Sequence, residues 1–224
     1  TTPDAALGAS SHYLFVVESA RGEVSIVAPA GATSSFINSD PLSPGFSGVP
    51  VGRLPVEAAT TADGCFIATA NQGSCDLSAI DVLGAVRQRT GIAWRRTVTA
   101  QGGTLAARPS AIVAPPGVPF DVNIPACDPS PAGLVYVAFP GCDLVGVVDL
   151  ASGSLVEGIR FPQGGPPVLT GPNATCPLEC AELAAGAAVP GGPVAPGGAP
   201  ITLAMDPDGG LLYVGLWNEP TVAV

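Results

Sequence analysis

The residues of this sequence best suited to chemistry are its six cysteines, which could form disulfides or hold a metal. They occur as three pairs that are close along the chain: Cys65 and Cys75, Cys127 and Cys142, and Cys176 and Cys180. None has the Cys-x-x-Cys or Cys/His spacing of a zinc site. An even number in local pairs indicates disulfides in an oxidising compartment, with metal binding and free buried thiols as alternatives. The spacing leaves the disulfide connectivity open.

Acidic residues offer a second kind of chemistry. Asp206 and Asp208, in the sequence Asp-Pro-Asp-Gly, are candidate Ca²⁺ ligands because calcium favours clustered oxygens. A tight turn explains the same four residues more simply, since Asp-Gly is a common turn dipeptide. Asp81 and Asp149, which follow apolar runs, are expected to cap turns. Calcium is therefore the one cofactor to consider, and the turn is the favoured interpretation.

Nucleophilic catalysis has little support. His12 is the only histidine, so any Ser-His-acid or Cys-His mechanism must use it, and it lies in the N-terminal lead-in. The sequence has no Gly-x-Ser-x-Gly elbow, P-loop or dinucleotide fingerprint. We predict no catalytic residues.

Large aromatic and basic side chains could contact a partner. Trp94, Arg95 and Arg96 are consecutive and could grip an anionic or planar group, and Trp217 could line a pocket. The favoured alternative for the first three is an exposed outer strand protected by charge. For Trp217 the alternative is packing followed by a turn.

Composition excludes some partners and indicates a compartment. The formal net charge of −10 disfavours nucleic acid and anionic membranes, which bind Lys and Arg. No stretch of about 20 residues is apolar enough to span a bilayer. Position 1 is Thr and no signal-like segment opens the chain, so we expect a mature exported protein, periplasmic, outer-surface or extracellular.

The elements that must position these residues form a repeated hairpin: an apolar run, a short turn and a second apolar run. The four copies are Tyr13–Val27, Cys65–Asp81, Leu134–Asp149 and Leu211–Val224. With 29 Gly and 25 Pro, the chain favours short strands and turns over helices. Further strands are expected in 55–64 and 200–209, each introduced by Pro and ending in an Asp-Gly turn, and outer strands are expected at 94–100 and 155–161.

The apolar runs are continuous rather than alternating, as at Leu14–Val17 and Leu134–Phe139. Both faces of each sheet must therefore be covered. We predict an all-β fold, a β-propeller of four-stranded antiparallel blades, with a β-sandwich as the alternative. The whole chain, 1–224, is expected to form one domain, with loop insertions at about 36–55, 115–132 and 162–200. Thr221–Val224 should be an unpaired edge, because a propeller of six to eight blades needs further blades from additional sequence or a second chain.

Several motifs resemble the YVTN family of β-propeller repeats. They are Leu212–Asn218, Val145–Asp149, Leu77–Asp81, and Pro200 with Asp206–Gly209. The pattern's strand-ending Asn is missing at Glu18 and Phe139, and long insertions and cysteines also depart from it. The resemblance implies an exported or surface protein that binds other molecules.

Two functions follow as hypotheses. The first is a non-enzymatic propeller that serves as a binding or structural subunit of a cell-surface or periplasmic assembly, with a protein partner or the remaining blades as its contact. The second, also implied by the resemblance, is part of a propeller enzyme, either a lactonase-like hydrolase or a subunit of a quinone-dependent dehydrogenase. Its active site would lie on the central axis.

Overall fold

The chain folds into short strands joined by turns, as its glycine and proline content predicts. The computed structural model describes residues 13–30, 33–40, 42, 44–45, 47–88, 93–101, 103–117, 127, 131, 133–174, 176–180, 197–219 and 222–224. In those residues the early strands are β1 (Leu14–Glu18), β2 (Glu23–Ala30), β3 (Thr33–Ile37), β4 (Val49–Pro50), β5 (Pro55–Thr60), β6 (Phe66–Asn71), β7 (Asp76–Asp81), β8 (Ala93–Thr97), β9 (Thr99–Ala100) and β10 (Gly103–Thr104). The later strands are β11 (Ala111–Val113), β12 (Leu134–Phe139), β13 (Leu144–Asp149), β14 (Ser154–Arg160), β15 (Val168–Leu169), β16 (Pro200–Met205), β17 (Leu212–Leu216) and β18 (Val222–Ala223). Single helical turns occur at η1 (Gly84–Gln88) and η2 (Pro140–Cys142).

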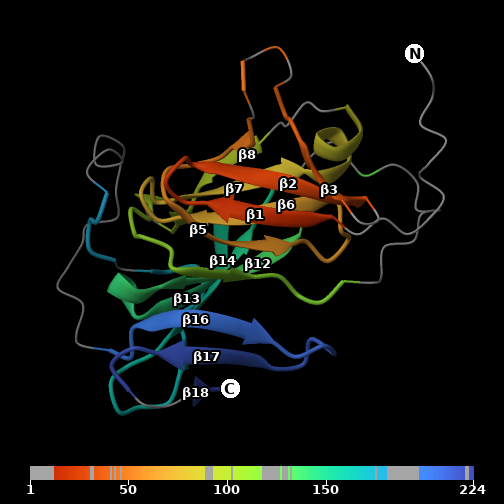
Figure 1. Ribbon diagram of the computed structural model, residues 1–224. Coiled ribbons are helices and arrows are strands. Elements are labelled where there is room, and N and C mark those ends of the chain that lie inside the picture. The colour runs from red at the N-terminus through yellow and green to blue at the C-terminus, as the bar shows by residue number, and fades with distance from the viewer. Residues whose placement is uncertain are drawn as a thin grey trace.

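The strands form separate antiparallel sheets in chain order (Figure 1). The first sheet has the order β1-β2-β3, with β4 also paired to β2, and the second has the order β5-β6-β7-β8. The third runs β10-β9-β14-β13-β12-β11 with β15 on β14, and the fourth is β16-β17-β18. The prediction of four-stranded units fits the second sheet. The third is larger because β9, part of the strand expected at 94–100, crosses from the second sheet and pairs in parallel with β14.

Consecutive sheets pack face to face, and each contact is an apolar core. Val24 and Ile26 of the first sheet pack against Ile67 and Ile80 of the second. The opposite face of the second sheet, with Ala68 and Leu77 among its members, packs against Val137 and Phe139 of the third. The third sheet's other face packs against Leu203 and Val214 of the fourth. Figure 1 shows the third sheet between the second and the fourth.

The predicted two-sided burial is therefore confirmed for the central sheets, where β6 is buried at all six positions and β7 and β13 nearly so. It is wrong for β1, in which Leu14 is 61% exposed and Val16 39% exposed. The reason is positional: β1 belongs to the outermost sheet at the N-terminal end of the stack. Only its inner face meets another sheet.

Register makes the four hairpins equivalent position by position. The pair Val17 and Val24 corresponds to Ala70 and Leu77, to Ala138 and Val145, and to Gly215 and Val222. In the first three hairpins this pair lies on the face that packs against the next sheet along the chain. We call this the forward face of each sheet, and the opposite one the backward face.

The described parts of the predicted insertions contain short strands that attach them to the sheets, and 181–196 lies outside the described residues. The segment 36–55 contributes the end of β3 and all of β4. The segment 162–200 contributes β15 and an isolated bridge between Pro162 and Gly197. Of 115–132, most lies outside the described residues. The predicted Asp-Gly turns are present, because Gly64 and Gly209 have positive φ of 70° and 72°.

Candidate functional site

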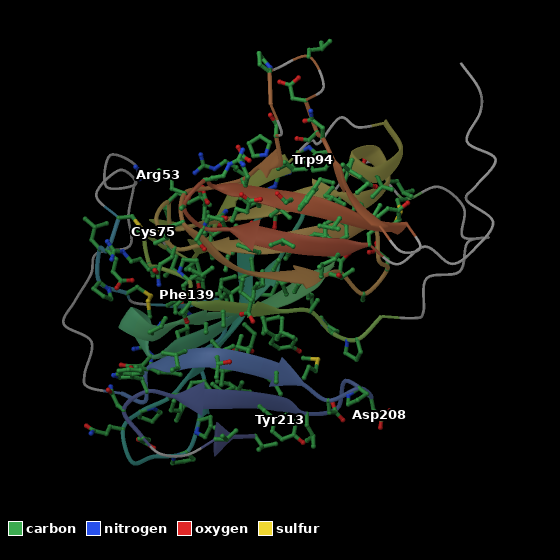
Figure 2. All side chains as sticks on the ribbon, viewed as in Figure 1. Arg53, Cys75, Trp94, Phe139, Asp208 and Tyr213 are labelled. Carbon is green, nitrogen blue, oxygen red and sulfur yellow. A yellow bond between two sulfur atoms is a disulfide. The ribbon has the colours of Figure 1, made fainter. Side chains whose placement is uncertain are left out.

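Polar side chains gather at the end of the stack where the hairpin turns lie. The β6–β7 turn and the β12–β13 turn are both at this end, which we call the turn end. Figure 2 shows Arg53, Cys75 and Phe139 there, whereas Asp208 lies at the opposite end. The turn end is the candidate functional site of the chain.

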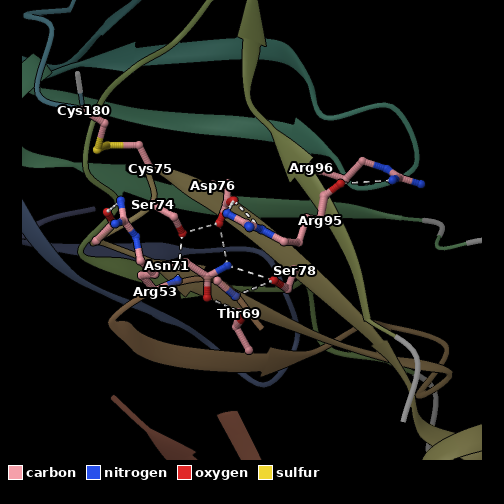
Figure 3. A network of polar contacts seen from close by, with 12 residues as sticks. Arg53, Thr69, Asn71, Ser74, Cys75, Asp76, Ser78, Arg95, Arg96 and Cys180 are labelled. Atoms are coloured by element: carbon pink, nitrogen blue, oxygen red, sulfur yellow. Dashed lines mark hydrogen bonds and ion pairs between the residues drawn. A yellow bond between two sulfur atoms is a disulfide. The ribbon is translucent and has the colours of Figure 1, made fainter. Parts of the chain in front are cut away.

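A buried polar network closes the β6–β7 hairpin on the backward face of the second sheet (Figure 3). Asn71 donates from Nδ2 to Asp76 Oδ1 and to Ser78 Oγ, at 2.9 Å in each case. Thr69 Oγ1 donates to Asn71 Oδ1 at 3.0 Å, and Ser74 Oγ donates to Asp76 Oδ1 at 2.8 Å. These five residues are buried, so each donor and acceptor needs a partner. The network supplies those partners.

One cation completes the network. Arg95 of β8 donates from Nε to Asp76 Oδ2 at 2.8 Å and forms an ion pair with the same carboxylate through its terminal nitrogen. The carboxylate is buried and the guanidinium is about half exposed. Asp76 therefore has its negative charge balanced, which a buried carboxylate requires.

The strap, residues 51–54, lies over this network and links the first sheet to the second. Gly52 N donates to Ser78 Oγ at 3.2 Å and Arg53 N donates to Ser74 Oγ at 2.9 Å. A Cβ at Gly52 would lie 2.4 Å from both Asp76 Oδ1 and Ser74 Oγ, so this position requires glycine. The strap seals the network with backbone because a side chain would not fit.

Two disulfides tie the turn end of the second sheet to that of the third. Cys75, in the β6–β7 turn, is bonded to Cys180, and Cys142, in the β12–β13 turn, is bonded to Cys176. Residues 176–180, which we call the clasp, thus hold two adjacent hairpin turns. The third disulfide, Cys65–Cys127, holds the insertion 115–132 to the start of β6. The predicted disulfides are confirmed, and every bond joins cysteines from different local pairs.

The clasp is also fixed by hydrogen bonds to the strand approach before β11. Glu179 N donates to the Ala106 carbonyl at 2.9 Å, and Arg108 N donates to Glu179 Oε2 at 2.7 Å. A Cβ at Gly141 would lie 2.6 Å from Glu179 Oε1. The clasp therefore packs directly on the third sheet's turn.

Two acids at sheet contacts have perturbed titration. Burial raises the pKa of Glu57 on β5, partly offset by the hydrogen bond that Ile112 N donates to its Oε2 at 2.8 Å. Burial likewise raises the pKa of Asp143, against the lowering effects of the Ala199 N–H and of Arg160. Both carboxylates accept a backbone N–H from a neighbouring sheet or its linker, so they join sheets. Neither forms a nucleophile–base pair.

Most of the residues predicted to contact a partner make contacts within the chain. Trp94 packs edge-on against Phe66, with ring centroids 5.8 Å apart. Arg95 pairs with Asp76, and Arg96 Nε donates to the Ala151 carbonyl at 2.9 Å. All three side chains therefore make contacts within the chain on β8, the last strand of the second sheet, and their contact with a partner stays a prediction. Trp217 is different, because its side chain is 74% exposed at the turn end of the fourth sheet.

The remaining candidates lie apart from the network. Asp206 Oδ1 accepts from Leu211 N at 2.8 Å in the β16–β17 turn, and Asp208 is exposed in the same turn. Asp149 caps its turn as predicted, accepting from Ala151 N and from the Ser152 hydroxyl. His12 lies outside the described residues. Within the described ranges no cluster of three or more His, Cys, Asp or Glu could hold a metal ion, and no helix could span a bilayer.

The polar network was not predicted from the sequence. One sequence feature pointed to the network: the YVTN pattern has an Asn at the end of the first strand of the hairpin. Asn71 matches that position, whereas Glu18 and Phe139 occupy it in the first and third hairpins. Ser78 and Ser74 carried no signal, because a short hydroxyl in a strand or turn is common. The strap was placed in a loop insertion, since only packing shows that Gly52 must lack a side chain.

Comparisons with known proteins give little beyond the geometry. No family model matches the chain, and no curated protein matches it. A solved structure, "Kuenenia stuttgartiensis Hydrazine Synthase", is similar at 18% sequence identity with a TM-score of 0.46. That match covers 90% of this chain and 38% of the other chain. A TM-score below 0.5 does not establish a shared fold, and membership of the YVTN family remains a prediction.

Proposed function

We propose that this chain is an exported, non-enzymatic module of the β-propeller type that acts as a binding or structural subunit of a cell-surface or periplasmic assembly. The proposal rests on a difference in burial between the central sheets and the outer sheets. Central sheets are covered on both faces, whereas the first and fourth sheets leave apolar side chains exposed, including Leu14 at 61% and Val222 at 61%. A rigid stack with apolar outer faces is suited to association.

The order of the sheets supports the propeller part of the proposal. The first strands of successive sheets lie together, because β11 contacts β5 on one side and β16 on the other. Ser19 Oγ donates to the Pro55 carbonyl at 2.6 Å, and Ser110 Oγ lies 3.4 Å from the Pro200 carbonyl. With the Ile112–Glu57 bond, β5, β11 and the start of β16 are linked in sequence, and the β1–β2 turn is linked to the start of β5. Successive sheets arranged about shared first strands are what a propeller requires.

The polar network supports a structural rather than a catalytic role for the turn end. Asp76, the carboxylate of the network, is bound by Asn71, Ser74 and Arg95 together. A catalytic acid or base needs a proton that it can exchange with a substrate. Here the carboxylate is enclosed by fixed donors and by the strap.

The disulfides support export. Structural disulfides persist in oxidising compartments and are rare in the cytosol. Three of them tie down the insertions of this chain, and in the described part of the chain every cysteine is bonded. The clasp then keeps the turn end rigid, which favours binding through a preformed surface.

The experiment is fractionation of host cells that carry an epitope-tagged copy of the gene. We expect the tagged protein in the extracytoplasmic fraction, with its cysteines oxidised and in a complex larger than the chain itself. A copy with Phe36→Glu, which charges the first sheet's outer face, should leave that complex, whereas Val156→Glu in the third sheet should remain. Reduced thiols in a cytosolic fraction would overturn the proposal.

A further inference from the structure

We infer that the outward faces of the first and fourth sheets are complementary halves of one interface, and that a second copy of this chain binds head to tail through them. The inference rests on the proposed function, because it names the partner for the exposed faces. Its basis is the positional equivalence of the four hairpins. Each outward face repeats a face that is buried elsewhere in the same chain.

In the part of the chain that the structure describes, no sheet lies on the forward face of the fourth sheet. By register, Tyr213, Gly215 and Val222 correspond to Tyr136, Ala138 and Val145 of the third sheet. In the third sheet those positions form part of the core against the fourth sheet. In the fourth sheet, Tyr213 and Val222 are exposed. Thr202 and Ala204 complete this face, which carries no charged residue.

The backward face of the first sheet likewise has no sheet of the described residues packed on it. Leu14 and Val27 correspond by register to Ile67 and Ile80 of the second sheet, which are buried in the core against the first sheet. Phe36 of β3 pairs with Val27 and extends the apolar area. Leu14 and Phe36 are more than half exposed. This face has the apolar positions that accept a preceding sheet.

The equivalence extends to the polar residues. Ser25 donates to Glu18 Oε1 across the first hairpin, as Asn71 and Ser78 are bonded across the second. Glu23 takes the place of Asp76, and Arg21 pairs with Glu23 at 2.9 Å, as Arg95 pairs with Asp76. The first hairpin is thus also closed by polar bonds on its backward face. In the second sheet the equivalent bonds are buried under the first sheet and the strap.

These faces determine the type of contact. Within the chain a forward face always meets a backward face, as each of the three cores shows. Among the described residues of one copy, one face of each type has no sheet packed on it, and two copies fit by joining the fourth sheet of one to the first sheet of the other. The contact is heterologous and can be made twice. Two copies would then contribute eight sheets, within the usual range of closed propellers.

The test uses the 224-residue chain and two single variants in analytical ultracentrifugation. The wild-type protein should associate at tens of micromolar. Tyr213→Asp blocks the forward face and Val16→Glu blocks the backward face, and each alone should weaken association by about 100-fold because a charge would be desolvated. Val156→Glu, on β14 and about half exposed, is the matched control and should associate like the wild type.

Mixing the two variants distinguishes this geometry from others. Tyr213→Asp retains a backward face and Val16→Glu retains a forward face, so the mixture should regain a dimer with one contact. If either variant still dimerises alone, the contact joins like faces and the inference is wrong. A wild-type chain that stays monomeric at 200 µM (about tenfold above the expected range) also overturns it. The proposed function survives that result if host fractionation still yields the Phe36-dependent complex.

Folding is checked separately. Far-ultraviolet circular dichroism and thermal unfolding should match the wild type for each variant. If Tyr213→Asp fails to fold, Val222→Lys replaces it, because Val222 is more exposed and lies on the same face. If Val16→Glu fails, Leu14→Lys replaces it on the backward face.

Discussion

The first and second hairpins close their turns through equivalent positions, but one of those positions holds Glu18 in the first hairpin and Asn71 in the second. In the second, Asn71 and Ser78 bond under a sheet and a strap, and Asp76 has a single cation. In the first, Glu18 and Glu23 share Arg21, whose side chain is 46% exposed. At this equivalent position, the buried site has the neutral amide of Asn71, and the solvent-accessible site has the carboxylate of Glu18. The difference shows that covering, rather than the repeat itself, sets the residue type.

The largest expected effect comes from releasing the clasp, which holds the second hairpin but not the first. The double variant Cys75→Ala with Cys180→Ala should lower the free energy of unfolding by about 3–4 kcal/mol, since the bond closes a long loop. Urea unfolding measures the loss. Hydrogen exchange should accelerate at residues 71–76 and stay unchanged at 18–23. Equal acceleration in both turns would show that the clasp acts on the whole stack.

Removing the carboxylate from each hairpin compares the two directly. Asp76→Ala leaves Asn71 and Ser74 without their acceptor in a buried place and should cost about 2–3 kcal/mol of unfolding free energy. Glu23→Ala, the matched change in the first hairpin, should cost less than about 1 kcal/mol because its ion pair is partly exposed. Urea unfolding of both variants is the measurement. Similar losses would mean that the first hairpin is as enclosed as the second.

A side chain in the strap tests the seal over the second hairpin. Gly52→Ala places a methyl group 2.4 Å from Asp76 Oδ1, so the strap must move, and we expect a loss of about 1–2 kcal/mol. Gly210→Ala is the control, because a Cβ there meets no atom within 4 Å. Thermal unfolding compares them. A neutral Gly52→Ala would show that the strap is loosely placed.

The smallest effect concerns Glu57, which links the second sheet to the third. Burial raises its pKa above the ordinary value of 4.5, so the folded state binds the proton more tightly than the unfolded state. The resulting stabilisation is present below pH 4.5 and is lost as the pH rises through the raised pKa. Glu57→Gln keeps an acceptor for Ile112 N and removes this loss. Its stability relative to the wild type should therefore increase from pH 4.5 towards 7, and parallel urea midpoints across that range would contradict the assignment.

The sequence predicted most of the architecture because continuous apolar runs and Asp-Gly turns are local signals. The hairpins at Cys65–Asp81 and Leu134–Asp149 form as expected, and the turn at Gly209 has the required positive φ. The strand 94–100 was divided because Thr99 pairs with the third sheet, a contact that no local pattern encodes. Disulfide partners such as Cys75 and Cys180 depend on how distant turns meet, so spacing could not assign them.

The candidate site was harder to predict than the fold. Arg95 was selected for its charge and expected to face outwards, yet its function in the structure is to balance Asp76. That role depends on the buried position of Asp76, which no local sequence pattern indicates. Gly52 required knowledge of the atoms that pack on it. Both examples depend on tertiary contacts rather than on residue type.

The most direct test of the account is hydroxyl-radical footprinting of the two outward faces as the protein concentration rises. Oxidation at Tyr213 and Leu14 should fall together over the range in which the copies associate, because each residue is covered by the other copy. Leu42, which is 95% exposed and outside both faces, should stay constant. Unchanged oxidation of Tyr213 and Leu14 in an associated sample would contradict head-to-tail binding through these sheets.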